Sequence, residues 1–175
     1  ALHEIYSREF SGAPECSLEF DLDVMDFNQS SARAEFTLPP FRCNGVPIHA
    51  LREEASLKNG IFSLDRISVE LGQDSFITAN GTYDASYSAA TGRVRGRCRF
   101  DDLIRLLGAP VRNSALSTLG VRADLIEFEG TLENFNLSSG SCKGLLSLRI
   151  RNLSIQKLGF HDISLELKAD GQSLN

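Results

Sequence analysis

The sequence contains no tryptophan, one methionine and no long run of apolar residues. No stretch approaches the ~20 consecutive apolar residues that a membrane-spanning helix needs. Positive charge is also scarce, because 18 Lys and Arg residues stand against 23 Asp and Glu residues, giving a formal net charge of -5. Such a balance does not attract nucleic acid, and a polyanionic partner would need a local basic patch. We therefore expect no nucleic-acid partner.

Motifs for catalysis and metal binding are missing as well. His3, His49 and His161 lie far apart in the sequence and accompany no serine or cysteine motif. Asp101 and Asp102 could serve as metal ligands, but the start of a predicted helix explains them better. We expect no catalytic residue, no metal and no cofactor, and we predict that the protein is not an enzyme.

The four cysteines, Cys16, Cys43, Cys98 and Cys142, form no C-x-x-C pair. Four cysteines allow three disulfide pairings, and the sequence does not choose among them. We expect free structural thiols, because Cys98 and Cys142 lie beside apolar neighbours and buried thiols behave as small hydrophobes. A disulfide is the alternative.

Apolar and polar residues alternate through much of the sequence. Residues 79–100 predict two strands joined by a turn, and in the second strand a period of two places four arginines opposite four other residues. The two sets are Arg93, Arg95, Arg97 and Arg99, and Val94, Gly96, Cys98 and Phe100. Residues 129–150 repeat the motif, because Gly130-Thr131, Gly140 and Gly144 follow the order of Gly81-Thr82, Gly92 and Gly96. We infer a protein built from a repeated hairpin unit.

The rest of the chain follows the same period of two. Alternation predicts strands over residues 2–10, 16–25, 32–38, 48–57, 61–71, 121–132, 143–151, 153–158 and 162–168. Residues 41–47 have no regular pattern, Asn59-Gly60 predicts a hairpin turn, and a bulge is expected near Asp65-Arg66. A helix capped by Asp101 and stopped by Gly108 should follow Phe100, with a short turn over 114–119.

These elements predict a mainly β protein with an antiparallel curled sheet or sandwich, groove-like in shape, and one or two short helices. Short connections favour antiparallel pairing, because parallel strands need long crossovers. We expect residues 1–175 to form a single β domain, since no low-complexity linker divides them. We also expect a fragment of a longer, repeat-containing protein, because the chain lacks an initiator methionine and its last residues stop within the pattern.

The order of these motifs resembles the AsmA-like family of bacterial envelope proteins, which includes AsmA, TamB and the YhdP-type proteins. The similarity covers about residues 55–170 and lies in three segments: SLKNGIFSLDRISVEL, FITANGTYDASYSAATGRVRGRCRFDDLIRLLG and FEGTLENFNLSSGSCKGLLSLRIRNLSIQKLGFHDISLEL. The resemblance implies β-sheets curled into a long groove, whose apolar interior carries phospholipid between the inner and outer membranes. It implies no catalytic residues.

On this resemblance we expect a section of an envelope protein whose apolar β-groove serves phospholipid transport or outer-membrane maintenance. Its location would be the periplasm, with the full-length protein anchored in the inner membrane. Its partners would be phospholipid or another acyl-chain ligand and the neighbouring repeats of the parent chain. Membrane contact would come from parts of the parent protein that are not present here. The alternative is a closed β-sandwich that acts as a scaffold or adhesion module through its loops and has no lipid groove.

Parity alone selects the residues that would line the groove: Leu18, Phe20, Leu22, Val24, Phe36, Val94, Phe100, Leu146, Leu148, Ile150, Ile163, Leu165 and Leu167. The predicted helix would plug one end of the apolar interior. The row of Arg93, Arg95, Arg97 and Arg99 has two interpretations. It could contact lipid headgroups at the groove rim, because guanidinium groups pair with phosphate. The commoner arrangement is a solvated face whose charges pair across strands, with Glu19, Asp21 and Asp23 as candidate partners.

Overall fold

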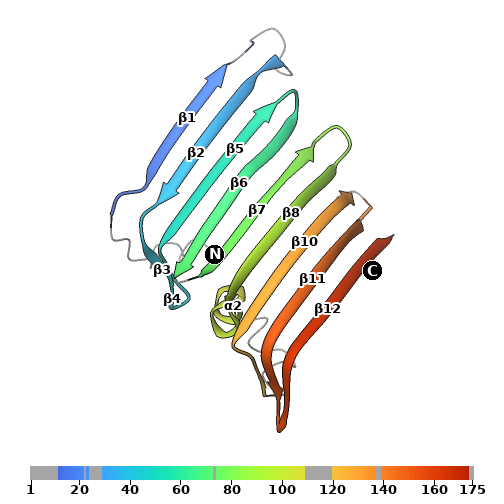
Figure 1. Ribbon diagram of the computed structural model, residues 1–175. Coiled ribbons are helices and arrows are strands. Elements are labelled where there is room, and N and C mark those ends of the chain that lie inside the picture. Colours follow the sequence, from blue (N-terminus) through green and yellow to red (C-terminus); the bar gives the residue numbers. More distant parts are fainter. Residues whose placement is uncertain are drawn as a thin grey trace.

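The computed structural model describes residues 12–21, 23, 29–72, 74–108, 120–136 and 139–173. A ten-stranded antiparallel sheet dominates them, in the order β1-β2-β5-β6-β7-β8-β10-β11-β12, with β9 beside β11 (Figure 1). The sheet does not close into a barrel, because β1 and β12 stand at opposite ends of this order. Its strands are β1 (Glu15–Asp21), β2 (Ser31–Leu38), β5 (Ala50–Lys58), β6 (Ile61–Gly72), β7 (Ser75–Asp84), β8 (Ala89–Arg99), β9 (Val121–Arg122), β10 (Leu125–Asn136), β11 (Ser141–Ile155) and β12 (Leu158–Ser173).

The mainly β, antiparallel fold predicted from the sequence is confirmed, and so are several local signals. Asn59 and Gly60 join β5 to β6 with positive φ angles of 52° and 73°, the conformation that a two-residue hairpin turn requires. The predicted bulge is present as well. The β5–β6 register shifts between Glu54, which faces Arg66, and Ala55, which faces Leu64, so Asp65 is left without a facing residue.

Residues 41–47 are not irregular, contrary to the prediction. They contribute to a small second sheet in which β3 (Phe41–Cys43) pairs with β4 (Val46–Ile48). Asn44 and Gly45 make the turn, with φ angles of 51° and 81°. Strands of three residues are too short for an alternating pattern to show, so only the Asn-Gly pair indicated this hairpin.

The predicted strand over 121–132 is divided into β9 and β10, and the separate strands predicted over 143–151 and 153–158 belong to one strand, β11. Asn152 lies inside β11 with a φ of 51°, and the pairing with β12 keeps its register on both sides of it. The turn comes instead at Gln156, whose φ is 55°. The predicted strand over 2–10 and the turn over 114–119 lie outside the described residues.

The predicted helix is present as α2 (Phe100–Leu107), but Asp101 does not cap it. Arg99 occupies the N-cap position and forms no side-chain capping hydrogen bond, while Asp101 and Asp102 lie in the first turn. Carboxylates there interact favourably with the N-terminal end of the helix dipole. The helix stops at Gly108, as predicted, where φ is 81°.

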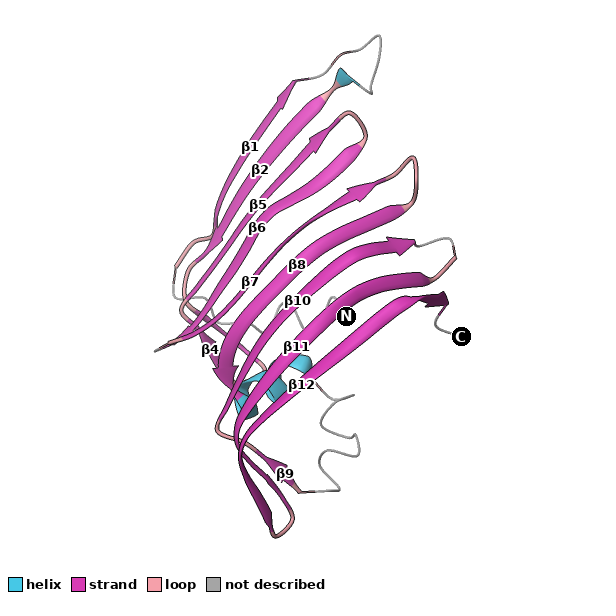
Figure 2. Ribbon diagram, turned by 45° about the vertical axis from the view of Figure 1, so that its right-hand side comes forward, coloured by secondary structure: helices cyan, strands magenta, loops and turns pink. Residues whose placement is uncertain are grey.

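The hydrophobic core gathers near one end of the strands. Its buried members come from the sheet and from the β3–β4 hairpin, and Leu103 and Leu106 of α2 pack against them: Phe41, Val46, Ile48, Leu71, Cys98, Ile126, Ile150 and Leu153. Figure 2 shows α2 behind the lower ends of β8 to β12. The helix and the small hairpin therefore cover one end of one face of the sheet, which confirms the predicted plugging position of the helix.

Candidate functional site

The strand registers join apolar side chains into rows that cross the sheet. One row runs from β7 to β12 through Ala79, Val94, Gly130, Leu146 and Leu167. Side chains of directly facing residues in an antiparallel pair point to the same side of the sheet. One face is therefore apolar from β7 to β12, and we call it the apolar face.

A neighbouring row extends the apolar face through the N-terminal strands. It joins Leu18 on β1, Ala34 on β2, Ala55 on β5, Leu64 on β6 and Gly81 on β7. A further row begins with Phe20, Ala32, Leu57, Phe62 and Tyr83. Glu53 interrupts the pattern, since it faces Phe36 on one side and Ile67 on the other. The apolar face thus runs across the whole strand order.

Much of the apolar face is exposed. The helix and the hairpin bury Cys98, Ile126 and Ile150 to 9% exposure or less. Away from this cover, large apolar side chains remain open to solvent: Leu18 62%, Phe20 64%, Leu57 43%, Phe62 44%, Leu165 47% and Leu167 56%. These exposed apolar residues lie on neighbouring strands of one face and are not scattered singly, so the apolar face is a candidate binding surface.

Glycines hollow the middle of the apolar face. A cavity of about 350 Å³ has Gly92, Val94, Gly130, Leu132 and Leu146 in its lining. At Gly130, an added Cβ atom would lie 3.1 Å from Val94 Cγ1 and 3.2 Å from Leu146 Cδ1. Because glycine has no side chain, the space between these two residues stays open and forms the bottom of the hollow. This volume lies within the range of small-molecule binding sites, roughly 300–1,000 Å³.

Close backbone approach explains why two other glycines stand on this face. A Cβ atom at Gly81 would lie 2.5 Å from the carbonyl oxygen of Thr91, and one at Gly144 would collide with the carbonyl oxygen of Thr131. Glycine inside a strand often marks such a bend or close approach. Figure 2 shows β8, β10, β11 and β12 bending toward the side that carries α2, so the apolar face is the inner face of the bend.

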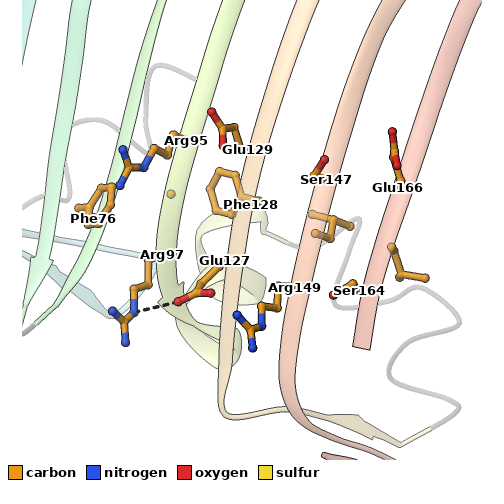
Figure 3. A pocket seen from close by; sticks show the side chains of 13 residues that line it. Phe76, Arg95, Arg97, Glu127, Phe128, Glu129, Ser147, Arg149, Ser164 and Glu166 are labelled. Atoms are coloured by element: carbon orange, nitrogen blue, oxygen red, sulfur yellow. Dashed lines mark ion pairs between the residues drawn. The ribbon is translucent and has the colours of Figure 1, made fainter. Parts of the chain in front are cut away.

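The arginine row lies on the opposite face, where Arg97 meets an acidic neighbour and Arg95 an aromatic ring (Figure 3). Arg97 Nε lies 3.5 Å from Glu127 Oε1, and Arg151 Nη2 lies 3.2 Å from the same oxygen. The guanidinium carbon of Arg95 lies 5.6 Å from the ring centroid of Phe76. The nearest acidic strand is therefore β10, whereas Glu19 and Asp21 are on β1 at the far edge of the sheet.

This geometry corrects the expectation that Arg93, Arg95, Arg97 and Arg99 contact lipid headgroups at the rim of the apolar groove. They belong to β8, an interior strand, and alternation points them away from the apolar face. The recess of about 670 Å³ beside them is lined by both signs of charge, including Arg95, Arg97, Glu127, Glu129 and Glu166. Such a recess has no strong preference for an anion.

Most of the residues predicted to line the groove do share the apolar face: Leu18, Phe20, Phe36, Val94, Leu146, Leu148, Ile150, Ile163, Leu165 and Leu167. Ile150 is buried beneath the cover. Phe100 departs from the prediction, because it starts α2 and is buried at 8% exposure instead of ending the strand. Leu22 and Val24 lie outside the described residues.

Sequence reasoning missed several residues of the same face: Leu51, Leu64, Ile67, Val69, Ile77 and Phe128. The alternation of Ile67 and Val69 was visible, but the bulge at Asp65 changes parity within β6. The predicted bulge near Asp65-Arg66 accounts for this change, and the pairing with β5 and β7 confirms that residues before and after it point to one side.

Among the described residues, no cluster of three or more His, Cys, Asp or Glu side chains could hold a metal ion. Within the same part of the chain, no helix has the length and apolarity to cross a membrane. Cys16, Cys43, Cys98 and Cys142 are all free thiols, as expected. Burial, together with the negative charge of Asp102, raises the pKa of Cys98 to about 11.

Comparisons with protein-family models, with curated proteins and with solved structures find no match to this chain. Its function is therefore inferred from the open apolar face and from the motifs of the sequence.

Proposed function

We propose that the apolar face binds the acyl chains of phospholipid, and that the chain is a section of an AsmA-like envelope protein in which this face forms a lipid path. The observation that supports this proposal best is the exposure of large apolar side chains along one continuous face, from Leu18 and Phe20 on β1 to Leu165 and Leu167 on β12. The apolar face of a sheet is normally packed against other apolar groups, and the hydrocarbon of an acyl chain can provide that contact.

The energetics are adequate for a binding site and for movement along it. Removing one methylene group from water is worth ~0.8 kcal/mol, so an acyl chain that buries about ten carbons gains roughly 8 kcal/mol before the costs of association. Neighbouring rows of the apolar face are similar in chemistry. A chain that slides across strands therefore exchanges one apolar contact for another, and no covalent step is needed.

Under this proposal the protein works in the periplasm. Neighbouring repeats of the parent chain would extend the apolar path, and the parent would supply the inner-membrane anchor. The resemblance to the AsmA-like family over about residues 55–170 supports these assignments.

A closed scaffold or adhesion module is the competing proposal. A closed sandwich needs a second sheet over the apolar face, and the second sheet among the described residues is the β3–β4 hairpin near one end. The exposure of Phe20 and Leu167, at 64% and 56%, favours the lipid-binding proposal.

Native mass spectrometry of the purified chain, after incubation with phospholipid vesicles, tests the proposal. We expect bound phospholipid on the wild type, little on Val94→Asp, and wild-type amounts on Ser164→Asp. Val94 lines the hollow, whereas Ser164 on β12 faces Arg149 on the opposite face of the sheet. Circular dichroism should show that both variants are folded. A wild type that carries no lipid, or equal losses in the two variants, would contradict the proposal.

A further inference from the structure

One side chain on the apolar face carries a charge where its neighbours carry none. The row that runs through Ala79 and the hollow continues across Ile67 on β6 to Glu53 on β5. Directly facing residues of an antiparallel pair share one side of the sheet, so Glu53 points to the apolar face. Among the described residues of this row, from β1 to β12, Glu53 alone has a carboxylate and no member has a basic group.

The surroundings of Glu53 are apolar as well. Leu51 and Ala55 flank it along β5 on the same face, and the two rows that pass through these residues contain no charged side chain. The Glu53 side chain is partly buried, and within the described part of the chain it has no hydrogen-bond or ion-pair partner. Burying a charge costs free energy unless a partner compensates it. A molecule that covers this part of the face must therefore supply a cation or leave Glu53 unpaired.

The next residue on the same strand has the opposite arrangement. Glu54 points to the polar face, where its Oε2 atom lies 3.8 Å from Arg33 Nη2 and its side chain is 41% exposed. Arg66 is its facing residue on β6. Glu54 thus has solvent and cations of the chain around it, and it provides a matched control for Glu53.

The chemistry of the position indicates an ammonium group as the partner of Glu53. Hard metal cations such as Ca²⁺ need six to eight oxygen ligands, roughly, and Glu53 offers a single carboxylate in an apolar row. An ammonium group attached to hydrocarbon satisfies both the charge and the apolar surroundings. The headgroup of an ethanolamine phospholipid ends in such a group. A glycerol phospholipid carries only the negative charge of its phosphate, which Glu53 would repel.

The distance from Glu53 to the hollow fits the length of a phospholipid. The strands β5 and β10 are four positions apart in the sheet, or about 19 Å at a strand spacing of about 4.8 Å. One phospholipid spans half of a bilayer of about 40–45 Å, which is about 20–22 Å. A lipid whose headgroup lies at Glu53 can therefore place the ends of its acyl chains in the hollow beside Val94 and Leu146.

We propose that Glu53 makes the apolar face selective for phospholipids with an ammonium headgroup, of the ethanolamine type, over anionic phospholipids. This inference rests on the proposed function, because it assumes that the apolar face binds phospholipid. It adds which headgroup is bound and where on the sheet it lies.

A competition experiment tests the selectivity. The purified chain is incubated with vesicles that contain equal amounts of phosphatidylethanolamine and phosphatidylglycerol with identical acyl chains, and native mass spectrometry measures each bound lipid. We expect at least about fivefold more ethanolamine lipid than glycerol lipid on the wild type, which is the effect of one charge pair about 4 Å apart in water. Glu53→Gln should bind the same total amount of lipid with a ratio near one. Glu53→Lys should reverse the preference.

Two control variants separate this local effect from the net charge of the protein. Glu54→Gln and Glu54→Lys change the net charge equally but act on the polar face, so they should keep the wild-type ratio. Circular dichroism should show that all four variants are folded. Equal binding of the two lipids by the wild type, or the same change of ratio in the Glu54 variants, would overturn the selectivity and leave the proposed function standing. A wild type that binds neither lipid would overturn both.

Discussion

On the apolar face, side chains near α2 and the β3–β4 hairpin are buried, and side chains far from them are exposed. Cys98 is fully buried beside this cover, whereas Cys16 on β1 is exposed. Burial disfavours the thiolate, and the charge of Asp102 adds to the effect, so the pKa of Cys98 rises to about 11. The same face thus holds an inert thiol and an accessible one.

The raised pKa of Cys98 predicts a loss of stability in alkali. The folded state favours the protonated thiol, so this contribution is complete below the usual pKa of about 9.0 and is lost as the pH rises toward about 11. Urea unfolding should show that, between about pH 8 and pH 11, the free energy of unfolding falls by about 2 kcal/mol more in the wild type than in Cys98→Ala. At about pH 8, a thiol reagent should label Cys16 quickly and Cys98 only after unfolding. Equal pH dependence in the two proteins would contradict the assignment.

At the scale of the strands, glycines allow the hairpins to bend. Gly144 on β11 and Gly81 on β7 stand where a neighbouring carbonyl oxygen leaves no room for a side chain. The glycine spacing that the sequence repeats therefore follows two hairpins, β7–β8 and β10–β11.

Substitution of Gly144 tests this role. Gly144→Ala should lower the free energy of unfolding by about 1–3 kcal/mol, because its Cβ atom would press on the rigid backbone of β10. The matched control is Gly159→Ala on β12, where no heavy atom lies within 4 Å of the added Cβ atom. That variant should stay within about 0.5 kcal/mol of the wild type. Chemical denaturation measures the free energy of unfolding of both variants. Equal changes in the two would contradict the prediction, because they would mean that the backbone of β10 makes room for the Cβ atom at no cost in stability.

The limits of prediction also appear at this scale. The alternation of β8 was enough to identify a strand, since its arginines and apolar residues separate without exception until Arg99. Phe100 continues that parity, yet it enters a helix, because periodicity does not mark where a strand stops. The partners of Arg97 depended on strand order, which brings β10 beside β8 and leaves β1 at the far edge. The strands of the main sheet follow one another in chain order, but the register that sets Glu127 opposite Arg97 arises across the segment between β8 and β10, and local pattern does not encode it.

At the scale of the whole molecule, the described residues form a sheet whose apolar face is covered near one end and exposed elsewhere. This asymmetry predicts different responses to a buried charge. Phe20→Asp should change stability by less than about 1 kcal/mol, because the side chain is 64% exposed. Ile126→Asp should lower the free energy of unfolding by several kcal/mol, roughly 3–5, because the side chain is 6% exposed and belongs to the apolar core. Urea denaturation compares the two, and a large loss for Phe20→Asp would indicate that the face is covered there.

The central claim is that hydrocarbon lies along the apolar face, and photo-crosslinking with a diazirine-labelled phospholipid tests it most directly. Peptide mapping should find label on alternate residues of β11 and β12, at Leu146, Leu148, Leu165 and Leu167, with little at Ser147 and Glu166 between them. Unlabelled phospholipid should compete for these positions. Label spread equally over both faces, or absent from these strands, would contradict the account.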